Sequence, residues 1–419
     1  MNNKYKKVVL DNGIRLYVHG DKTMRKCFVS YTVEYGSSGE YFKFNYKGKD
    51  YEVLPGCAHF LEHMLLEQSK YGNLYKYFKS LKYITNAYTA FDRTKFFFSG
   101  VTNIKSSIKK LIDALENPIF GDKEIKEVSY AVAEETKRGL NNPFWQGIYL
   151  HARNMYKNFD YVHESLSSIG TEETTNALDY NMLRLCFDAF YSDDRKIIVI
   201  TGPIDEDDMI NYIKKIYSKI NNHKNETKLI IPEDLRTVRK KEDVLVRKPV
   251  EDDTLFIGYN EYLEGFSRFE IDSFICYISL MKFSNKSEWF DRLTKEGSLV
   301  TYNGCNYDHI FKDGQFDYMF IFIVRDKDKI IKEFEKEIRI RDFDEKDFEL
   351  YKKGMISDYI YSWDDKYYYY TILSDEIISN KKEIDYIEEV NNLSFDRFIK
   401  FYNSLKFDNR VITLLTKEG

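Results

Sequence analysis

Two histidines and a glutamate share one short apolar segment of the chain, and their spacing suits metal chemistry. The segment "GCAHFLEHMLLE" covers residues 56–67 and holds His59, Glu62 and His63, two of only seven histidines in 419 residues. Residues three and four positions apart share one face of a helix, so these three side chains would project together. Two imidazoles one turn apart can bind a single Zn²⁺ ion, each with a Zn–N distance of about 2.1 Å.

Glu62 has a predicted chemical role of its own. A zinc ion lowers the pKa of a bound water to about 7, and a carboxylate beside the metal can take the proton from that water. The competing interpretation is an amphipathic helix with partly buried histidines, which would suffice for a single histidine. In a chain this poor in histidine, chance produces the full H-x-x-E-H pattern roughly once in a hundred sequences. The pattern therefore predicts a zinc site.

A catalytic zinc ion needs three protein ligands and one open position, so a third ligand must come from another element. The predicted helix "KEVSYAVAEETKRG" offers three carboxylates, Glu127, Glu134 and Glu135. Glu127 and Glu134 are two helical turns apart and would share a face. The residues alone do not choose among the three, and all three could be solvated helix carboxylates.

The elements around these residues follow an α+β pattern that occurs twice along the chain. An Asn-Gly turn predicts a hairpin over residues 8–20, and β-rich and helically spaced segments follow it in both halves. We expect two related α/β-sandwich domains in tandem, each with a mostly antiparallel sheet packed by helices. The expected ranges are 1–222 for the zinc-binding domain, 223–243 for a polar linker and 244–419 for a second domain without a metal site.

Composition narrows the class of protein. A net charge of −5 with acids and bases interspersed argues against a nucleic-acid partner, and no apolar run reaches the roughly 18 residues that a membrane span needs. The five cysteines are scattered and form no C-x-x-C pair, which favours reduced thiols and a cytoplasmic location. The first residues run directly into strand-like sequence, so we expect no secretion signal.

The motifs together resemble the pitrilysin/insulinase metallopeptidase family, which includes mitochondrial processing peptidase and carries the inverted H-x-x-E-H zinc motif. The resemblance covers the whole chain and is strongest to the short bacterial two-domain members. It rests on "LDNGIRLYV", "GCAHFLEHML", "NAYTAFDRTKFFFSG", "HESLSSIGT" and "FDAFYSDDRKIIVITGPID". It implies a zinc-dependent endopeptidase that acts on peptides or unfolded segments, with leader or precursor peptides as substrates by analogy.

The resemblance also implies roles for single residues. The third-ligand helix of the family reads Glu-Val, five residues and Glu, and "EVSYAVAE" fits this pattern. Glu134 would then be the third zinc ligand, and Glu127 would be a supporting catalytic residue. Asn86 and Ala87 would line the cleft on an exposed strand edge, to which a peptide substrate adds as an extra strand.

The second half departs from the family pattern. Members usually place an Arg and a Tyr there, but in "WFDRLTKEGSLVTYNGCNY" Thr294 stands at the Arg position, while Arg292 and Tyr302 are out of register. We therefore expect a related partner subunit to supply the Arg/Tyr pair in a heterodimer, with a homodimer as the other arrangement. The alternative function is a non-catalytic, scaffold-like subunit of the same fold. Other zinc-dependent hydrolysis is a third possibility, without further support in the sequence.

Overall fold

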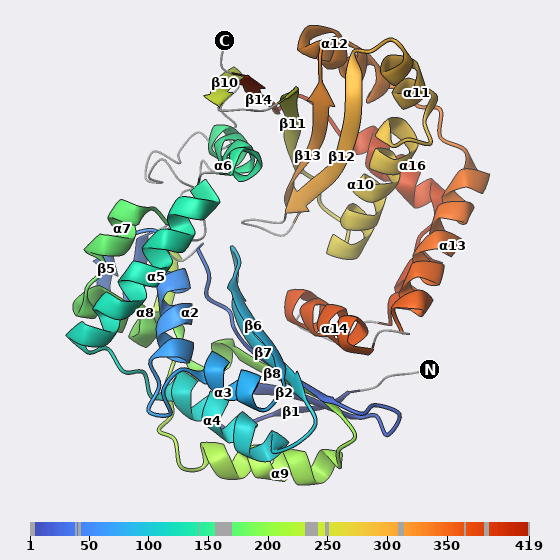
Figure 1. Ribbon diagram of the computed structural model, residues 1–419. Helices are drawn as coiled ribbons and strands as arrows, with labels where there is room; N and C mark the ends of the chain where they lie inside the picture. Colours follow the sequence, from blue (N-terminus) through green and yellow to red (C-terminus); the bar gives the residue numbers. More distant parts are fainter. Residues whose placement is uncertain are drawn as a thin grey trace. The chain divides into compact units, whose positions relative to one another are not determined.

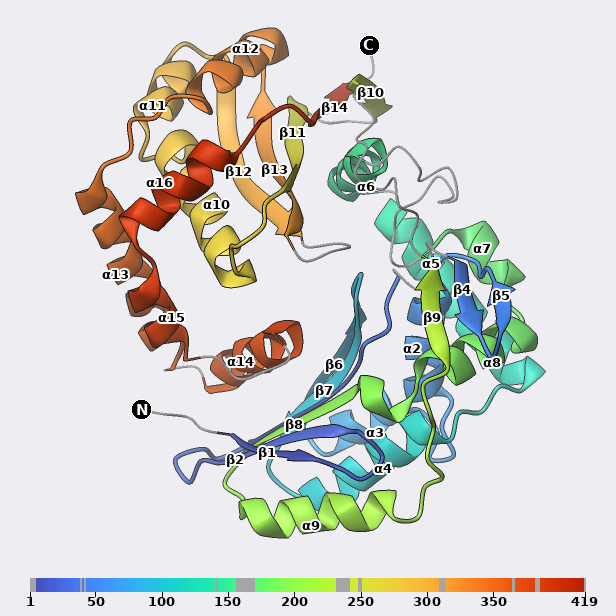
Figure 2. The same cartoon turned by 180° about the vertical axis from the view of Figure 1, so that it is seen from behind.

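The computed structural model describes residues 5–37, 40, 43–140, 142–155, 170–230, 242–247, 251–308, 314–363, 366–380 and 385–417. The chain forms two compact units, each with a sheet covered by helices (Figures 1 and 2). Both sheets are mostly antiparallel, so the predicted fold class is confirmed. In the part of the chain that the structure describes, no helix is long and apolar enough to cross a membrane.

The first unit contains a six-stranded sheet in the order β1-β2-β8-β3-β7-β6. Neighbours are antiparallel except β2 and β8, which run parallel. The predicted hairpin forms at β1–β2, where Gly13 has a positive φ of 98° that favours glycine. The strands are β1 (Lys6–Val9), β2 (Arg15–Gly20), β3 (Cys27–Val33), β6 (Ile84–Thr89), β7 (Thr94–Gly100) and β8 (Lys196–Gly202).

Helices cover both faces of this sheet. Alternate residues of β7 separate the faces: Phe96 and Phe98 join the core beneath α2 and α4, while Lys95, one residue before Phe96, points to α14 on the other face. A small sheet in the order β5-β4-β9 lies in the same unit. The other elements are β4 (Lys43–Tyr46), β5 (Lys49–Tyr51), α2 (Cys57–Glu67), α3 (Leu74–Ser80), α4 (Ile104–Glu116), α5 (Asp122–Leu140), α7 (Glu172–Ala177), α8 (Tyr180–Phe190), η2 (Asp193–Arg195), α9 (Glu206–Tyr217), β9 (Thr227–Ile230) and α14 (Lys366–Asn380).

The second unit repeats this plan around a five-stranded sheet in the order β10-β14-β11-β13-β12. One face of β11 packs on a core of aromatic and aliphatic residues that includes the buried helix α10. On the other face, Phe256 packs against residues of α6. The elements are α6 (Pro143–Met155), β10 (Glu242–Arg247), β11 (Asp253–Tyr262), α10 (Arg268–Phe283), α11 (Glu288–Lys295), β12 (Leu299–Asp308), β13 (Gln315–Val324), α12 (Lys327–Glu337), α13 (Glu345–Ser362), α15 (Tyr386–Asn392), α16 (Phe395–Ser404) and β14 (Arg410–Lys417).

The two units are not consecutive stretches of sequence. Residues 139–166 of the first half group with the second unit, and residues 360–385 of the second half group with the first unit. Each half thus contributes one helix, α6 or α14, to the sheet of the other half. The expected ranges 1–222 and 244–419 do not include this exchange. Most of the expected linker and most of "HESLSSIGT", namely residues 231–241 and 163–169, lie outside the described residues.

Candidate metal centre

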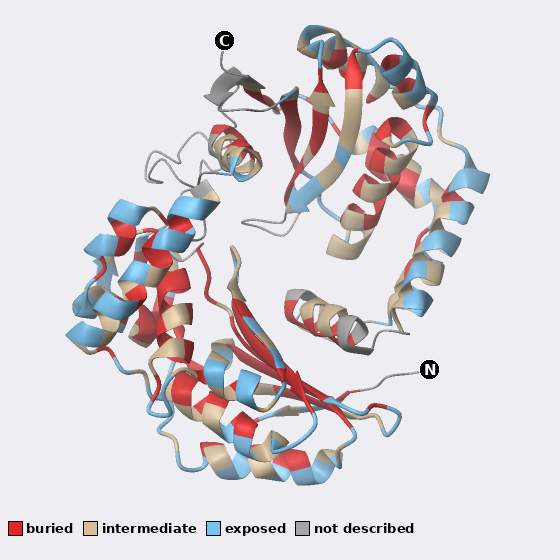
Figure 3. Ribbon diagram, in the orientation of Figure 1, coloured by how far each residue is buried: buried red, intermediate tan, exposed pale blue. Residues whose placement is uncertain are grey.

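The helix α2 carries the two histidines, and a buried carboxylate holds its N-terminus. Gly56 precedes the helix with a φ of 93°. The Glu40 side chain is 6% exposed and accepts hydrogen bonds from the backbone N–H groups of Gly56, at 2.7 Å, and Ala58. A carboxyl oxygen at a helix N-terminus satisfies backbone N–H groups that have no partner within the helix, and burial raises the pKa of Glu40 to about 8. Nearly all of α2 is buried, so the helix has a fixed place beneath the sheet (Figure 3).

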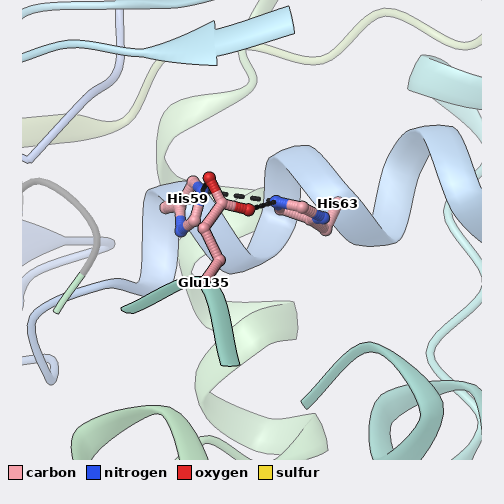
Figure 4. Close-up of side chains that lie close together, drawn as sticks. All are labelled: His59, His63 and Glu135. Carbon is pink, nitrogen blue, oxygen red and sulfur yellow. Dashed lines mark hydrogen bonds and ion pairs between the residues drawn. The ribbon is translucent and has the colours of Figure 1, made fainter. Parts of the chain in front are cut away.

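Three side chains converge beside this helix, as Figure 4 shows. The Nε2 atoms of His59 and His63 lie 3.3 Å apart. The Glu135 carboxylate places one oxygen 3.4 Å from Nε2 of His63 and the other 3.9 Å from Nε2 of His59. Two ligand atoms, each about 2.1 Å from a tetrahedral zinc ion, lie about 3.4 Å apart. The donor set and its spacing therefore fit one zinc ion.

The carboxylate that the structure places beside the two histidines is Glu135, the neighbour of the predicted Glu134, and zinc binding by Glu134 stays a prediction that this structure does not support. The buried residues of α5 include Val128, Val132 and Thr136, which mark its inward face. Successive helical residues are rotated by about 100°. Glu135, whose side chain is 49% exposed, therefore lies at the edge of the inward face, while Glu134 lies on the opposite side of the helix. A difference of one residue thus decides which carboxylate reaches the histidines.

Glu127 lies near the end of α2 but outside this cluster. Its carboxylate accepts a hydrogen bond from the Gln68 amide at 3.3 Å and lies 3.8 Å from the Lys123 ammonium. The side chain is 54% exposed, so these contacts are typical of a solvated helix carboxylate. The structure does not bring Glu127 to the histidines, and its supporting catalytic role stays a prediction.

Glu62 lies beside the cluster in a nearly dry environment. Glu62 is only 3% exposed. The Thr89 hydroxyl donates a hydrogen bond of 2.8 Å to its Oε2. Burial raises the pKa of Glu62 to about 7, although His63 and the Thr89 hydrogen bond act in the opposite direction. A general base that must also return its proton works best with a pKa near the working pH. The environment of Glu62 suits that task.

The two histidines differ in their electrostatic surroundings. Burial, with the neighbouring His63, lowers the pKa of His59 to about 3, so its imidazole is neutral. Burial also acts to lower the pKa of His63, but hydrogen bonds to Glu135 and Glu67 outweigh it and raise the pKa to about 10. A metal ion binds the neutral imidazole, so metal binding at neutral pH would displace the proton of His63.

Glu67 is a site residue that the sequence analysis missed. Its carboxylate lies 2.7 Å from Nδ1 of His63, one helical turn further along α2. A hydrogen bond to Nδ1 orients the ring and leaves Nε2 free for a metal, as is usual for metal-binding histidines. The signal was available, because Glu67 follows His63 by four residues within the same segment.

The predicted substrate residues lie on the strand that ends beside Glu62. Asn86 and Ala87 are in β6, the edge strand of the first sheet, and pair with Phe97 and Phe96 of β7. No described strand pairs with the other edge of β6. Asn86 is exposed and Ala87 is 8% exposed. The last residue of the strand, Thr89, contacts Glu62, so the free edge of β6 runs up to the candidate base. Substrate binding by Asn86 and Ala87 stays a prediction.

Arg292 and Tyr302, which are out of register with the family pattern, already contact other side chains of the second unit. The Arg292 guanidinium lies 2.7 Å from the Glu333 carboxylate. The Tyr302 hydroxyl lies 2.6 Å from the Ser279 hydroxyl. Both side chains thus have local partners in the surroundings of α11 and β12.

The chain is similar to known proteins in sequence and in fold. The family profile described as Insulinase (Peptidase family M16) matches residues 48–153, and the profile described as Peptidase M16 inactive domain matches residues 177–355. A Bacillus subtilis relative named "Uncharacterized zinc protease YmfH" is 29% identical over 210 residues, which are 50% of this chain and 48% of the relative. The chain thus spans about half the length of this relative.

Solved structures share the fold over the whole chain. An M16-like peptidase from Alicyclobacillus acidocaldarius has a TM-score of 0.86 at 21% identity and covers 100% of this chain and 99% of its own. A structure described as a peptidase M16 inactive domain, from Pseudomonas fluorescens, has a TM-score of 0.75 at 11% identity and covers 99% of this chain and 98% of its own. At these identities the likeness shows the fold, and the chemistry must be argued from the residues.

Proposed function

Because the chain belongs to the insulinase family of peptidases, family M16, we propose that it is a zinc-dependent endopeptidase. The observation that carries the proposal is the convergence of His59, His63 and Glu135 beside the buried carboxylate of Glu62. The two histidines and Glu62 lie within the segment that matches the insulinase profile. Relatives with "zinc protease" in their names, such as YmfH, support the same assignment.

The roles of the residues follow from their positions. His59, His63 and Glu135 would hold the metal, and bound zinc would supply a Lewis acid and make water more acidic. Glu62 takes a proton from the attacking water and returns it to the nitrogen of the leaving amine. Thr89 orients the Glu62 carboxylate through the hydrogen bond to Oε2. Glu67 keeps the His63 ring in the orientation that metal binding needs.

The substrate class follows from the free edge of β6. A peptide that adds to a strand edge must be extended and must expose its own backbone N–H and C=O groups. Peptides and unfolded segments meet this requirement, whereas most backbone groups of a folded domain are already paired. Leader or precursor peptides are one such class of substrate. Asn86 and Ala87 are the residues of β6 that we expect beside the bound peptide.

Removal of the metal tests this function directly. Purified chain treated with a strong chelator should lose hydrolysis of an unstructured fluorogenic peptide, and one equivalent of Zn²⁺ per chain should restore it. The reason is that the imidazoles and carboxylates of the cluster cannot supply the Lewis acid themselves. Activity that survives complete removal of zinc would contradict the proposal.

The same measurement addresses the scaffold alternative. The match of residues 177–355 to a profile described as an inactive domain favours it. The retention of Glu62 argues against it, because a scaffold does not need a buried carboxylate beside a pair of histidines. A chain that binds zinc but cleaves no peptide, alone or with a partner, would favour the scaffold. We expect zinc binding and cleavage together.

We further propose that a related partner subunit supplies the Arg/Tyr pair. The engagement of Arg292 with Glu333 and of Tyr302 with Ser279 supports this proposal, because neither side chain is free in its own unit. The purified chain should hydrolyse peptides slowly by itself and faster once the related subunit is added, as steady-state rates and molar mass in solution would report. A full rate from a homodimer or a monomer would contradict the heterodimer. The cytoplasmic location stays a prediction.

A further inference from the structure

The sheet that carries β6 is covered on one face by a helix from the far end of the sequence. The helix α14 belongs to the first unit although it follows four of the five strands of the second sheet in the chain (Figure 1). Tyr370 of α14 is fully buried, and its hydroxyl donates a hydrogen bond of 2.9 Å to Asp21. The helix therefore has specific polar contacts with the first unit, in addition to apolar packing.

The strongest of these contacts centres on Asp375. Its Oδ1 accepts hydrogen bonds from the Lys95 ammonium at 2.7 Å and from the Tyr88 hydroxyl at 2.9 Å. Lys95 also donates to the Ser374 hydroxyl at 2.7 Å, and its side chain is 0% exposed. A buried ammonium needs a nearby carboxylate, since an unpaired buried charge is strongly unfavourable. Asp375 is that carboxylate, and the same oxygen holds Tyr88.

Tyr88 connects this cluster to the candidate substrate strand. It lies in β6 between Ala87 and Thr89. Neighbouring residues of a strand point to opposite faces, so Tyr88 reaches α14 while Thr89 reaches Glu62 on the α2 side. The end of β6 is thus fixed from both faces, by Glu62 on one and by Asp375 on the other.

This arrangement matters because β6 is an edge strand. Only β7 pairs with it among the described strands. The backbone N–H and C=O groups on the other edge of β6 therefore form no hydrogen bonds to a neighbouring strand that would fix their position. A peptide can add to that edge only where the strand stays extended and in register. Side-chain contacts on the two faces are the other means of keeping an edge strand in place, and Tyr88 provides the one on the α14 side.

We propose that Asp375 is a positioning residue for substrate: through Tyr88 it holds β6 so that the free edge can accept a peptide next to Glu62. This inference rests on the proposed function and extends it. It makes a residue from the second half of the sequence part of the peptide-binding apparatus of the first unit. It also assigns the buried Lys95 the task of holding Asp375 in place through their hydrogen bond.

Two substitutions test the proposal by hydrogen exchange and by peptide binding. Tyr88→Phe removes one hydroxyl and leaves the Lys95–Asp375 pair intact, while Asp375→Asn weakens both contacts. Each should speed amide exchange of residues 84–89 about tenfold, since a hydrogen bond to a charged group contributes about that factor. Zinc content and the exchange of residues 57–67 should not change.

Peptide binding is measured with an unstructured fluorescein-labelled peptide and zinc-loaded chain in the non-cleaving Glu62→Gln background. Each substitution should weaken peptide binding about five- to tenfold. The peptide affinity of the double variant should equal that of the single variant with the lower affinity. In the active background, Tyr88→Phe should raise KM by the same factor with little change in kcat, as for a contact that binds ground state and transition state alike. Matched controls are Tyr130→Phe and Asp328→Asn, whose side chains are exposed.

The outcomes separate this inference from the proposed function. Unchanged exchange at residues 84–89 in both variants overturns the inference, whether or not the chain is a peptidase. Additive effects on binding in the double variant also overturn it, because Tyr88 and Asp375 would then act independently. If exchange becomes faster but the parent chain binds no peptide, the proposed function fails and the substrate role of β6 fails with it. If Asp375→Asn detaches α14 from the first sheet, the result for Tyr88→Phe alone tests the inference.

Discussion

Glu62→Gln should lower kcat for peptide hydrolysis by about 10²–10⁴-fold, the usual contribution of a general acid–base group, and should leave zinc binding unchanged. Glutamine keeps the shape of the side chain and can still accept the Thr89 hydrogen bond. It cannot take a proton from water. Because Glu62 is buried and has a pKa raised to about 7, it is suited to hold a proton between the two halves of the reaction.

Steady-state kinetics and metal analysis of the same preparation check this result. Glu288→Gln is the matched control, since Glu288 is an exposed residue of α11 in the second unit. The control should keep both zinc and activity. If Glu62→Gln retained more than about a tenth of the parent rate, Glu62 would not be the general base.

Glu135→Ala and Glu134→Ala should have very different effects on zinc. Loss of a residue that only supports a ligand typically costs 10–100-fold in metal affinity, so loss of the ligand Glu135 should cost more than about hundredfold. Glu134→Ala should change the affinity less than about threefold, because the helical rotation of about 100° per residue places Glu134 on the outward side of α5. Titration of zinc against a competing chelator measures both affinities.

The two adjacent alanine variants control for each other. They remove the same group from the same helix, so effects on helix propensity and net charge are equal. The opposite result, a loss of zinc with Glu134→Ala only, would restore the ligand that the family resemblance implied. Equal and small effects would show that neither carboxylate binds the metal.

The histidine pair could be predicted from the sequence because its geometry is local. Spacings of three and four residues on one helix fix the relative positions of His59, Glu62 and His63 before any tertiary contact forms. The same locality makes Glu67 predictable in principle. The choice between Glu134 and Glu135 is not local, since it depends on which face of α5 is buried. Thr136 is part of that buried face, and a threonine gives no strong hydrophobic signal.

The exchange of α6 and α14 between the units could not be predicted from the sequence. An amphipathic pattern shows that a helix buries one face, but it does not show against which sheet. The first half of α14 lies in a tyrosine-rich segment, and Tyr370 within it is buried. Nothing in its spacing points to Asp21 or Lys95, which lie more than 270 residues away in the chain. Only the tertiary structure identifies these partners.

The central claim is one zinc ion held by His59, His63 and Glu135, and anomalous diffraction from crystals of the zinc-loaded chain tests it most directly. Data at the zinc absorption edge should show one peak, about 2.1 Å from Nε2 of each histidine and from a carboxylate oxygen of Glu135. A peak ligated by Glu134, with Glu135 turned away, would contradict the assignment of the third ligand. The absence of any zinc peak at the two histidines would contradict the zinc site and the function proposed from it.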